Sequence, residues 1–344
     1  MMTGSIAKGA TAEEALRAYF ISLGYFAVRS LPFNYKGFDV TDVDLWLYLK
    51  SSSLTRERVC VDVKRKKTPQ AMERVFWTKG LREVLGVDRA VVVTTDNRRE
   101  TRQFGVSHGV TVLHGDFLQR VITGRSSPST RISEEQLLSE LKVPCVLDSN
   151  ISWSRFYREA KATLLVGLNY NGCNELLNRI RLLIEEYLAT NKGSKASVRL
   201  LYLLTSYFLI TLDYSSLLIT HLDAKLRKES LAEGFRYGEA GRDRAEEIVD
   251  TALQLLADTS SPDLFSRTKL KGEVETQLSE YPAEVLAEYF AKSEVLRELF
   301  VHACVFEKAA YASQPIMPHQ CSSEQKVFLG LLCDFLKIDR KQII

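Results

Sequence analysis

The sequence predicts an α/β domain built on a mixed β-sheet, followed by an all-α domain. Residues 1–125 contain short apolar runs that alternate with amphipathic stretches, and this alternation is typical of a sheet with a parallel crossover. Residues 134–344 have apolar residues at three- and four-residue spacings and no convincing strand pattern, which indicates helices. Residues 126–133 are mostly small and polar, so we interpret them as the linker between the two domains.

The chain is expected to begin with a helix that starts at Thr11 and ends at Gly24. Thr11 and Glu14 have the spacing of a capping box. Glu13 and Glu14 both fall in the predicted first turn, where the helix dipole favours negative charge. Helix capping is therefore a sufficient explanation for Glu14, and a weaker one for Glu13. Residues 25–29 follow as a short strand, and a polar loop leads to the next strand.

Two apolar runs, residues 43–49 and 59–64, are predicted to be strands, and each carries an acid. Asp62 and Lys64 lie two residues apart, so they point to the same face of their strand. If the two runs pair as a hairpin, Asp44 is brought beside them. Two carboxylates and an ammonium at a sheet edge are costly unless something uses them. A divalent metal with an attacking water is one such use.

The rest of the first domain is predicted to alternate helices and strands. The apolar run 89–95 is continuous, as expected for a strand that is buried on both faces. The expected elements here are helix 70–86, strand 89–95, helix 96–108, strand 110–113 and helix 115–121. In the second domain the expected helices are 134–142, 153–166, 171–190, 196–220, 241–257, 282–314 and 323–337.

The charge is distributed unevenly along the chain. Residues 1–125 contain 20 Lys and Arg against 13 Asp and Glu, whereas the remainder contains 26 against 30. A basic N-terminal domain suits a polyanionic partner, although a moderately basic solvated surface explains the same numbers.

Three features indicate a cytoplasmic protein that does not cross a membrane. Six scattered cysteines without a CxxC pair indicate reduced thiols. The first ten residues lack the apolar region of a signal peptide. The most apolar stretch, residues 200–220, approaches the length of a membrane span, but Asp213 and several hydroxyl side chains favour a buried core helix.

The order of these residues resembles the PD-(D/E)XK nucleases of the restriction-endonuclease-like fold. Asp44, then Asp62-x-Lys64, then a helix and a buried strand is the layout of that superfamily. Residues 8–30 also resemble the start of archaeal Holliday junction resolvases, in which a helix acid eleven residues before the helix-ending glycine joins the active site. In this chain that acid is Glu13.

The resemblance extends to the end of the first domain. Residues 91–95 (VVVTT) and 104–118 (FGVSHGVTVLHGDFL) are similar to the closing strand and helix of Mrr-like restriction enzymes, so the likeness covers about residues 8–121. Two positions depart from the common pattern. Asp62 replaces the commoner Glu, and Val43 replaces the Pro that precedes the first acid in the motif. Both variants are permitted, and no residue of the motif is missing.

The resemblance implies a site for Mg²⁺, with Mn²⁺ as an alternative. It makes Asp44, Asp62 and the carbonyl of Val63 the metal ligands, with Glu13 holding a metal-bound water or a second metal. Lys64 is implied to orient or deprotonate the attacking water, or to neutralise the phosphate. A purely structural interpretation is that Asp44 caps a strand turn and that Asp62 pairs with Lys64.

The resemblance also implies DNA as the substrate. The natural phosphate contacts around the site are Arg65, Lys66 and Lys67, and such contacts give affinity without sequence information. Lys79, on the following helix, is a candidate accessory residue or part of a solvated face. Arg98, Arg99 and Arg102 either extend the basic surface or belong to a solvated helix face. We interpret Trp46, Tyr48 and Trp77 as core residues and not as base-stacking platforms.

Three functions remain as hypotheses. The first is a Mg²⁺-dependent endonuclease that hydrolyses DNA phosphodiester bonds in restriction, phage defence or repair. The second is a catalytically inactive nuclease fold that serves as a nucleic-acid-binding or assembly subunit. The third is a nuclease that acts on RNA. In each, the helical domain would target the substrate, form a homodimer or bind a partner protein.

Overall fold

The computed structural model describes residues 8–65, 70–124, 130–190, 193–259 and 267–344. They form two compact units. The first, here called the sheet unit, comprises residues up to Val166 together with Lys308–Pro315. The second, the helical unit, comprises Gly167–Glu307 and Ile316–Ile344.

A five-stranded mixed sheet forms the centre of the sheet unit, as predicted, with its strands in chain order from one edge to the other. The first three strands are antiparallel, and the last two run parallel to the third. The strands are β1 (Phe26–Tyr35), β2 (Phe38–Lys50), β3 (Arg56–Lys64), β4 (Arg89–Thr94) and β5 (Val110–Leu113).

The first two strands are longer than predicted. The segment predicted as a polar loop continues β1 and β2 and ends in a tight turn at Lys36 and Gly37. Both turn residues have positive φ, at 48° and 86°, which suits the right-handed twist of a two-residue hairpin. The sequence did not predict this extension, because polar and charged residues interrupt it and both of its faces near the turn are exposed.

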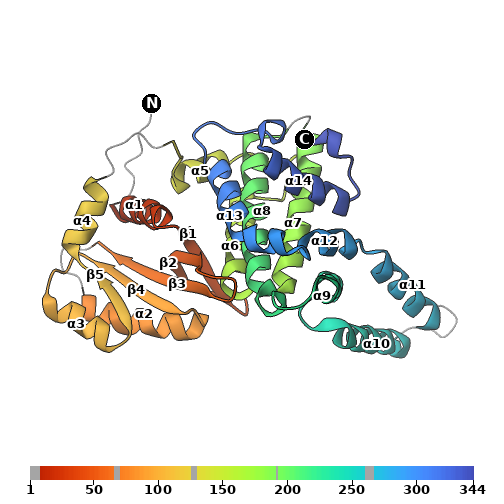
Figure 1. Ribbon diagram of the computed structural model, residues 1–344, viewed down its shortest axis with the longest axis horizontal. Helices are drawn as coiled ribbons and strands as arrows, with labels where there is room; N and C mark the ends of the chain where they lie inside the picture. The colour runs from red at the N-terminus through yellow and green to blue at the C-terminus, as the bar shows by residue number, and fades with distance from the viewer. Residues whose placement is uncertain (1–7, 66–69, 125–129, 191–192, 260–266) are drawn as a thin grey trace. The chain divides into compact units, whose positions relative to one another are not determined.

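Helices cover both faces of the sheet (Figure 1). On one face lie α1 (Lys8–Ser22) and α4 (Gly115–Thr123), and on the other lie α2 (Ala71–Leu85) and α3 (Arg99–Ser107). Alternate residues of each strand enter the core beneath α1, so on β3 Val59, Val61 and Val63 point to this core. Asp62 and Lys64 therefore point to the α2 face.

The start of α1 differs from the prediction. The helix begins at Lys8, so Thr11 lies inside it and the predicted capping box is wrong. Glu14 is buried and pairs with Arg17 at 2.9 Å and with Arg29 at 2.8 Å. Its structural role is thus an ion pair inside the protein and not the capping of a helix terminus.

Two helices predicted for the second domain belong to the sheet unit. They are α5 (Glu134–Glu140) and α6 (Trp153–Val166). The helix α6 packs along β1 and covers that edge of the sheet, which would otherwise be open to pairing. Lys161 of α6 also donates to the backbone carbonyl of Arg29 in β1 at 3.0 Å. The compact units therefore divide after Val166 and not at 126–133.

The helical unit confirms the all-α prediction. In the described residues after β5 there is no strand, and only isolated bridges join Arg131 to Ala312 and Pro144 to Ser152. Its helices are α7 (Tyr170–Ala189), α8 (Lys195–Ser215), α9 (Ala224–Tyr237), α10 (Gly241–Thr259), α11 (Arg267–Glu280), α12 (Ala283–Phe290), α13 (Ser293–Ala310) and α14 (Ser323–Phe335). In the described residues, 3₁₀ turns lie between helices at Ser216–Ile219 and Pro318–Gln320, and another follows α14 at Arg340–Gln342. The last residues of α13 are part of the sheet unit.

The helix α8 with its following turn is long and apolar enough to cross a membrane. However, 72% of its apolar window is buried inside the protein, which is consistent with the core helix of a soluble protein, as predicted from its polar residues. All six cysteines are free thiols.

Candidate active site

The candidate site lies where β2 and β3 separate. The two strands pair from Lys50 and Arg56 as far as Leu45 and Val61. Beyond that point β2 continues beside β1, and β3 continues beside β4. Asp44 and Asp62 are the first residues after the last pair, so both acids lie at the fork between the strands.

Asp44 closes this fork with its side chain. One carboxylate oxygen accepts a hydrogen bond of 2.6 Å from the backbone amide of Val63. The amide lies on the β2 side of β3, where the ladder has ended, and a buried backbone donor needs a partner. This bond holds the carboxylate of Asp44 against the strand that carries Asp62.

Lys64 lies close to both acids at the fork. Its Nζ lies 3.9 Å from Asp44 Oδ2 and 3.8 Å from Asp62 Oδ1. The Asp62 side chain is only 6% exposed, whereas that of Lys64 is 32% exposed. The structure therefore brings together three of the four predicted catalytic residues. It also confirms that their strands form an antiparallel hairpin.

The carboxylate of Asp44 is held in surroundings that disfavour its charged form. Burial, together with the negative charges of Asp62 and Glu13, raises the pKa of Asp44 to about 6. The hydrogen bond from Val63 and the ammonium of Lys64 lower it, but they do not compensate. An additional cation at this fork would thus be favourable.

Arg74 is a site residue that the sequence analysis missed. Its Nε donates to Asp62 Oδ2 at 2.9 Å, and its second guanidinium nitrogen contacts Asp62 Oδ1. The buried residues Ala71, Val75 and Thr78 mark the side of α2 that faces the sheet. Arg74 lies four residues before Thr78 and thus on that side. The helical periodicity could have revealed it.

Lys79, the residue predicted on this helix, is placed differently. It is half-buried and forms no ion pair with either acid in the described part of the chain. It follows Arg74 by five residues, which turns it well away from the face of Arg74.

Glu13 is close enough to raise the pKa of Asp44 but belongs to another group of charges. It comes from α1, on the opposite face of the sheet from α2. Its carboxylate accepts a hydrogen bond of 3.0 Å from Arg29, which also bonds Glu14 and Glu135. Within the described residues, no three Asp, Glu, His or Cys side chains are arranged to hold a metal ion.

The remaining donors nevertheless fit Mg²⁺. This ion binds hard oxygen ligands and commonly takes one or two carboxylates, keeping waters at its other positions. Asp44, Asp62 and the Val63 carbonyl supply such oxygens, and the raised pKa of Asp44 indicates that its buried carboxylate would gain from a bound cation. The guanidinium of Arg74 now contacts both oxygens of Asp62, so Arg74 and a metal would compete for this carboxylate.

The predicted phosphate contacts are only partly described. Arg65 is exposed directly after Lys64, whereas Lys66 and Lys67 lie outside the described residues. Arg98 forms an ion pair with Asp96 at 2.7 Å.

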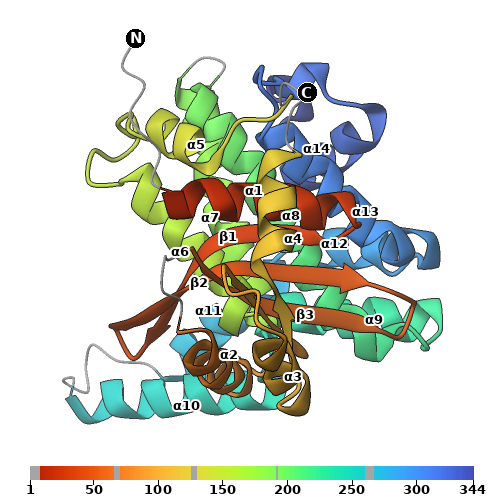
Figure 2. The same cartoon turned by 90° about the vertical axis from the view of Figure 1, so that its left-hand side faces the viewer.

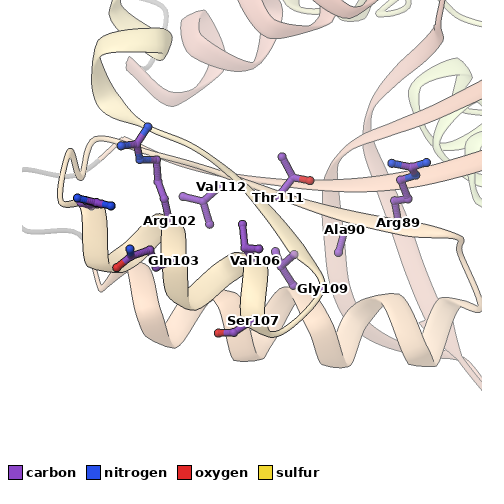
Figure 3. A pocket seen from close by; sticks show the side chains of 11 residues that line it. Arg89, Ala90, Arg102, Gln103, Val106, Ser107, Gly109, Thr111 and Val112 are labelled. Atoms are coloured by element: carbon purple, nitrogen blue, oxygen red, sulfur yellow. The ribbon is translucent and has the colours of Figure 1, made fainter.

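A second basic surface lies at the β5 edge of the sheet. Arg99 and Arg102 line an open groove of about 870 Å³ between α3 and β5, with Arg89 toward its other end (Figure 3). None of the candidate catalytic residues lines this groove. It therefore extends the basic surface but does not form part of the acidic fork.

The aromatic residues near the site divide into two groups. Trp46 and Tyr48 are fully buried and stack with ring centroids 5.9 Å apart, which confirms their predicted core role. Trp77 is 46% exposed, so its assignment to the core is wrong. It lies on the side of α2 that carries Arg74, whose guanidinium is 5.4 Å from the centre of the Trp77 ring.

No protein-family model matches the chain, and no curated protein or solved structure matches it either.

Proposed function

We propose that the chain is a metal-dependent endonuclease of the PD-(D/E)XK type that hydrolyses phosphodiester bonds in DNA. The observation that carries this proposal is the convergence of Asp44, Asp62 and Lys64 at the strand fork. An Asp-x-Lys sequence alone is short. Its position on the third strand, with the first acid on the neighbouring strand and a helix on the same face, gives it weight.

The residues of the fork divide the chemistry between them. Asp44 and Asp62 would hold Mg²⁺ or Mn²⁺ together with the Val63 carbonyl. When bound, the ion supplies Lewis-acid stabilisation of the charge that develops on the phosphate and lowers the pKa of water. Lys64 is poised between the two acids, where its ammonium can position the attacking water or neutralise a phosphate oxygen.

Arg74 has a second use in this scheme. A guanidinium binds phosphate and carboxylate with the same two-pronged geometry. When a metal engages Asp62, Arg74 is free to bind the phosphate that enters the site. The carboxylate of Glu13 would reach the site only if its ion pair with Arg29 broke, so we do not count Glu13 among the direct metal ligands.

A nucleic acid is the favoured substrate because the basic charge is concentrated in the first 125 residues, and the resemblance to PD-(D/E)XK nucleases favours DNA. Arg65, Arg99 and Arg102 are exposed and extend the phosphate-binding surface. A cytoplasmic role in restriction, phage defence or repair fits such an enzyme, with the helical unit serving targeting, dimerisation or partner binding.

The test is cleavage of supercoiled plasmid with Mg²⁺ by the wild-type chain, Asp62→Asn and Lys64→Met. We expect both variants to lose at least about 100-fold in rate, and EDTA to stop the wild type. Glu83→Gln is the matched control, because Glu83 is exposed on α2 and forms its ion pair with Arg82, away from the fork. Equal nicking by wild type and Asp62→Asn would refute the proposal. A labelled RNA duplex in parallel separates the two nucleic acids.

A second candidate is a nuclease fold that binds nucleic acid without cutting it. The bidentate contact of Arg74 with Asp62 favours this function, because it satisfies the acid without a metal. Mn²⁺ binding followed by electron paramagnetic resonance distinguishes the two. Binding that is lost in Asp44→Asn supports the enzyme. Intact DNA affinity without any Mn²⁺ binding supports the binding subunit.

A further inference from the structure

An apolar groove of about 260 Å³ lies beside the candidate active site. One wall is the outer part of the β1–β2 hairpin, with Phe33, Val40 and Thr41. The other wall is α2, with Phe76, Trp77 and Gly80. Figure 2 shows the end of this hairpin next to α2.

Several large apolar side chains that line the groove are exposed. Phe76 is 59% exposed and Val40 is 50% exposed, in addition to Trp77. Single exposed apolar residues are common on protein surfaces, but a contiguous apolar patch that lines a groove marks a binding site.

Both walls of the groove continue into the fork. Trp77 lies one helical turn after Arg74, whose guanidinium contacts the Trp77 ring and the carboxylate of Asp62. On the other wall, Val40 precedes Asp44 by four residues on β2, and residues at this spacing share a face of the strand. A ligand that reaches the acids is thus also within reach of the groove.

Gly80 is a separate indication that this groove binds a ligand. It lies inside α2, and a Cβ atom at this position would meet no other atom within 4 Å. Glycine is a poor residue for a helix interior, and close packing does not require it here. Its missing side chain keeps the groove open beside Trp77, as glycine does where a ligand approaches a backbone.

The Phe76 ring on the α2 wall of the groove is held in place before any ligand binds. The Phe76 ring packs edge-on against Phe104 of α3 at 5.3 Å and against His108, directly after α3, at 5.8 Å. A ring fixed in this way loses little freedom when another ring stacks on it, which favours binding.

We propose that this groove binds an unpaired nucleobase next to the phosphate that is cut. The substrate would then be DNA with unpaired nucleotides, such as a single strand, gap or junction, in preference to an intact duplex. This inference rests on the proposed nuclease function. Thr41 supplies the one polar side chain among the lining residues, so the base is held by stacking and without sequence readout. The cations of Arg74 and Lys64 lie where the attached phosphate would enter.

The test measures binding in EDTA, where no cleavage occurs. Trp77 is the exposed tryptophan, since Trp46 and Trp153 are fully buried, so its fluorescence reports stacking. We expect a single-stranded oligodeoxynucleotide to quench this fluorescence and to bind about tenfold more tightly than a blunt duplex of the same sequence. Equal affinity for both DNAs without quenching would overturn the inference.

Variants separate stacking from general binding. Trp77→Ala should weaken single-strand binding about tenfold and leave duplex binding unchanged, whereas Trp77→Phe should retain most of the affinity. Gly80→Leu should produce the same selective loss by filling the groove. Leu23→Ala, which alters an exposed apolar residue that lines neither this groove nor the basic groove, is the control and should change neither affinity.

Other outcomes identify a different occupant or a failure of the proposed function. If Trp77→Ala changes the sedimentation of the chain and leaves DNA binding intact, the groove binds a second copy and the inference is wrong. Plasmid cleavage without any preference for unpaired DNA overturns the groove proposal alone. Quenching by single strands without cleavage in Mg²⁺ overturns the nuclease function and leaves a base-binding groove.

Discussion

The ammonium of Lys161 lies 2.8 Å from a carboxylate oxygen of Glu134, and both side chains are buried in the sheet unit. Arg17 contacts the second oxygen of Glu134 at 3.2 Å, and Tyr157 and Tyr311 donate further hydrogen bonds to the same carboxylate. Burial alone would raise the pKa of Glu134, but Lys161 and Arg17 outweigh it and hold the pKa at about 2.

Glu134→Gln should destabilise the protein by roughly 3–5 kcal/mol at pH 7, because it removes the carboxylate that pairs with the buried Lys161, while Arg17 keeps its pair with Glu14. The pKa is depressed, so this stability is present above pH 4.5 and is lost as the pH falls toward 2. Urea unfolding from pH 7 to pH 3 should show a smaller decline in the variant than in the wild type.

The control for this prediction is Glu159→Gln on α6, whose carboxylate forms an exposed pair with Arg155. This variant should change the free energy of unfolding by less than about 1 kcal/mol. If Glu134→Gln proves equally mild, the buried cluster is not the link that joins α5 and α6 to the sheet.

A fragment that ends at residue 133 should fail to fold. It would leave Arg17 without Glu134 and Arg29 without Glu135, and it would uncover the β1 edge. A fragment that ends at Val166 restores these partners. Circular dichroism during heating should show a cooperative transition for the longer fragment and none for the shorter. A cooperative transition for both would support the boundary at 126–133.

Asp44→Asn should stabilise the protein while it abolishes cleavage. The raised pKa means that ionised Asp44 destabilises the folded state, so wild-type stability falls as the pH rises from about 4 through 6. The variant should gain on the order of 1–3 kcal/mol at pH 7, since the Asn carbonyl can still accept from Val63. Asp42→Asn, next to the site and exposed, is the control for chemical denaturation.

Arg74→Met should strengthen Mn²⁺ binding by about tenfold, because it removes the cation that competes for Asp62. The same change should weaken DNA binding, because a phosphate partner is lost. Electron paramagnetic resonance of Mn²⁺ and DNA-binding anisotropy measure the two effects. Arg82→Met, on the same helix and paired with Glu83, should change neither. Weaker Mn²⁺ binding in Arg74→Met would contradict competition.

Several parts of the fold and the site could be predicted because they depend on local spacing. The alternation of side chains on β3 places Asp62 and Lys64 on one face, and the short connection after β2 brings Asp44 beside them. Continuous apolar runs likewise indicated the parallel strands. The β1–β2 extension could not be recognised, because both faces of its end are exposed and polar residues interrupt its apolar ones.

The sequence by itself determined the order of the elements from α1 to α8 and the three residues that meet at the fork. It missed α9 and α11, and it predicted one helix where α12 and α13 lie. Only the tertiary structure decided that Arg74 binds Asp62, that Arg29 binds Glu13, that Trp77 is exposed and that Lys161 joins α6 to the sheet. Residues on one strand or on adjoining strands have positions set by backbone periodicity. Contacts between a helix and a sheet depend on how their faces pack, which spacing along the chain does not specify.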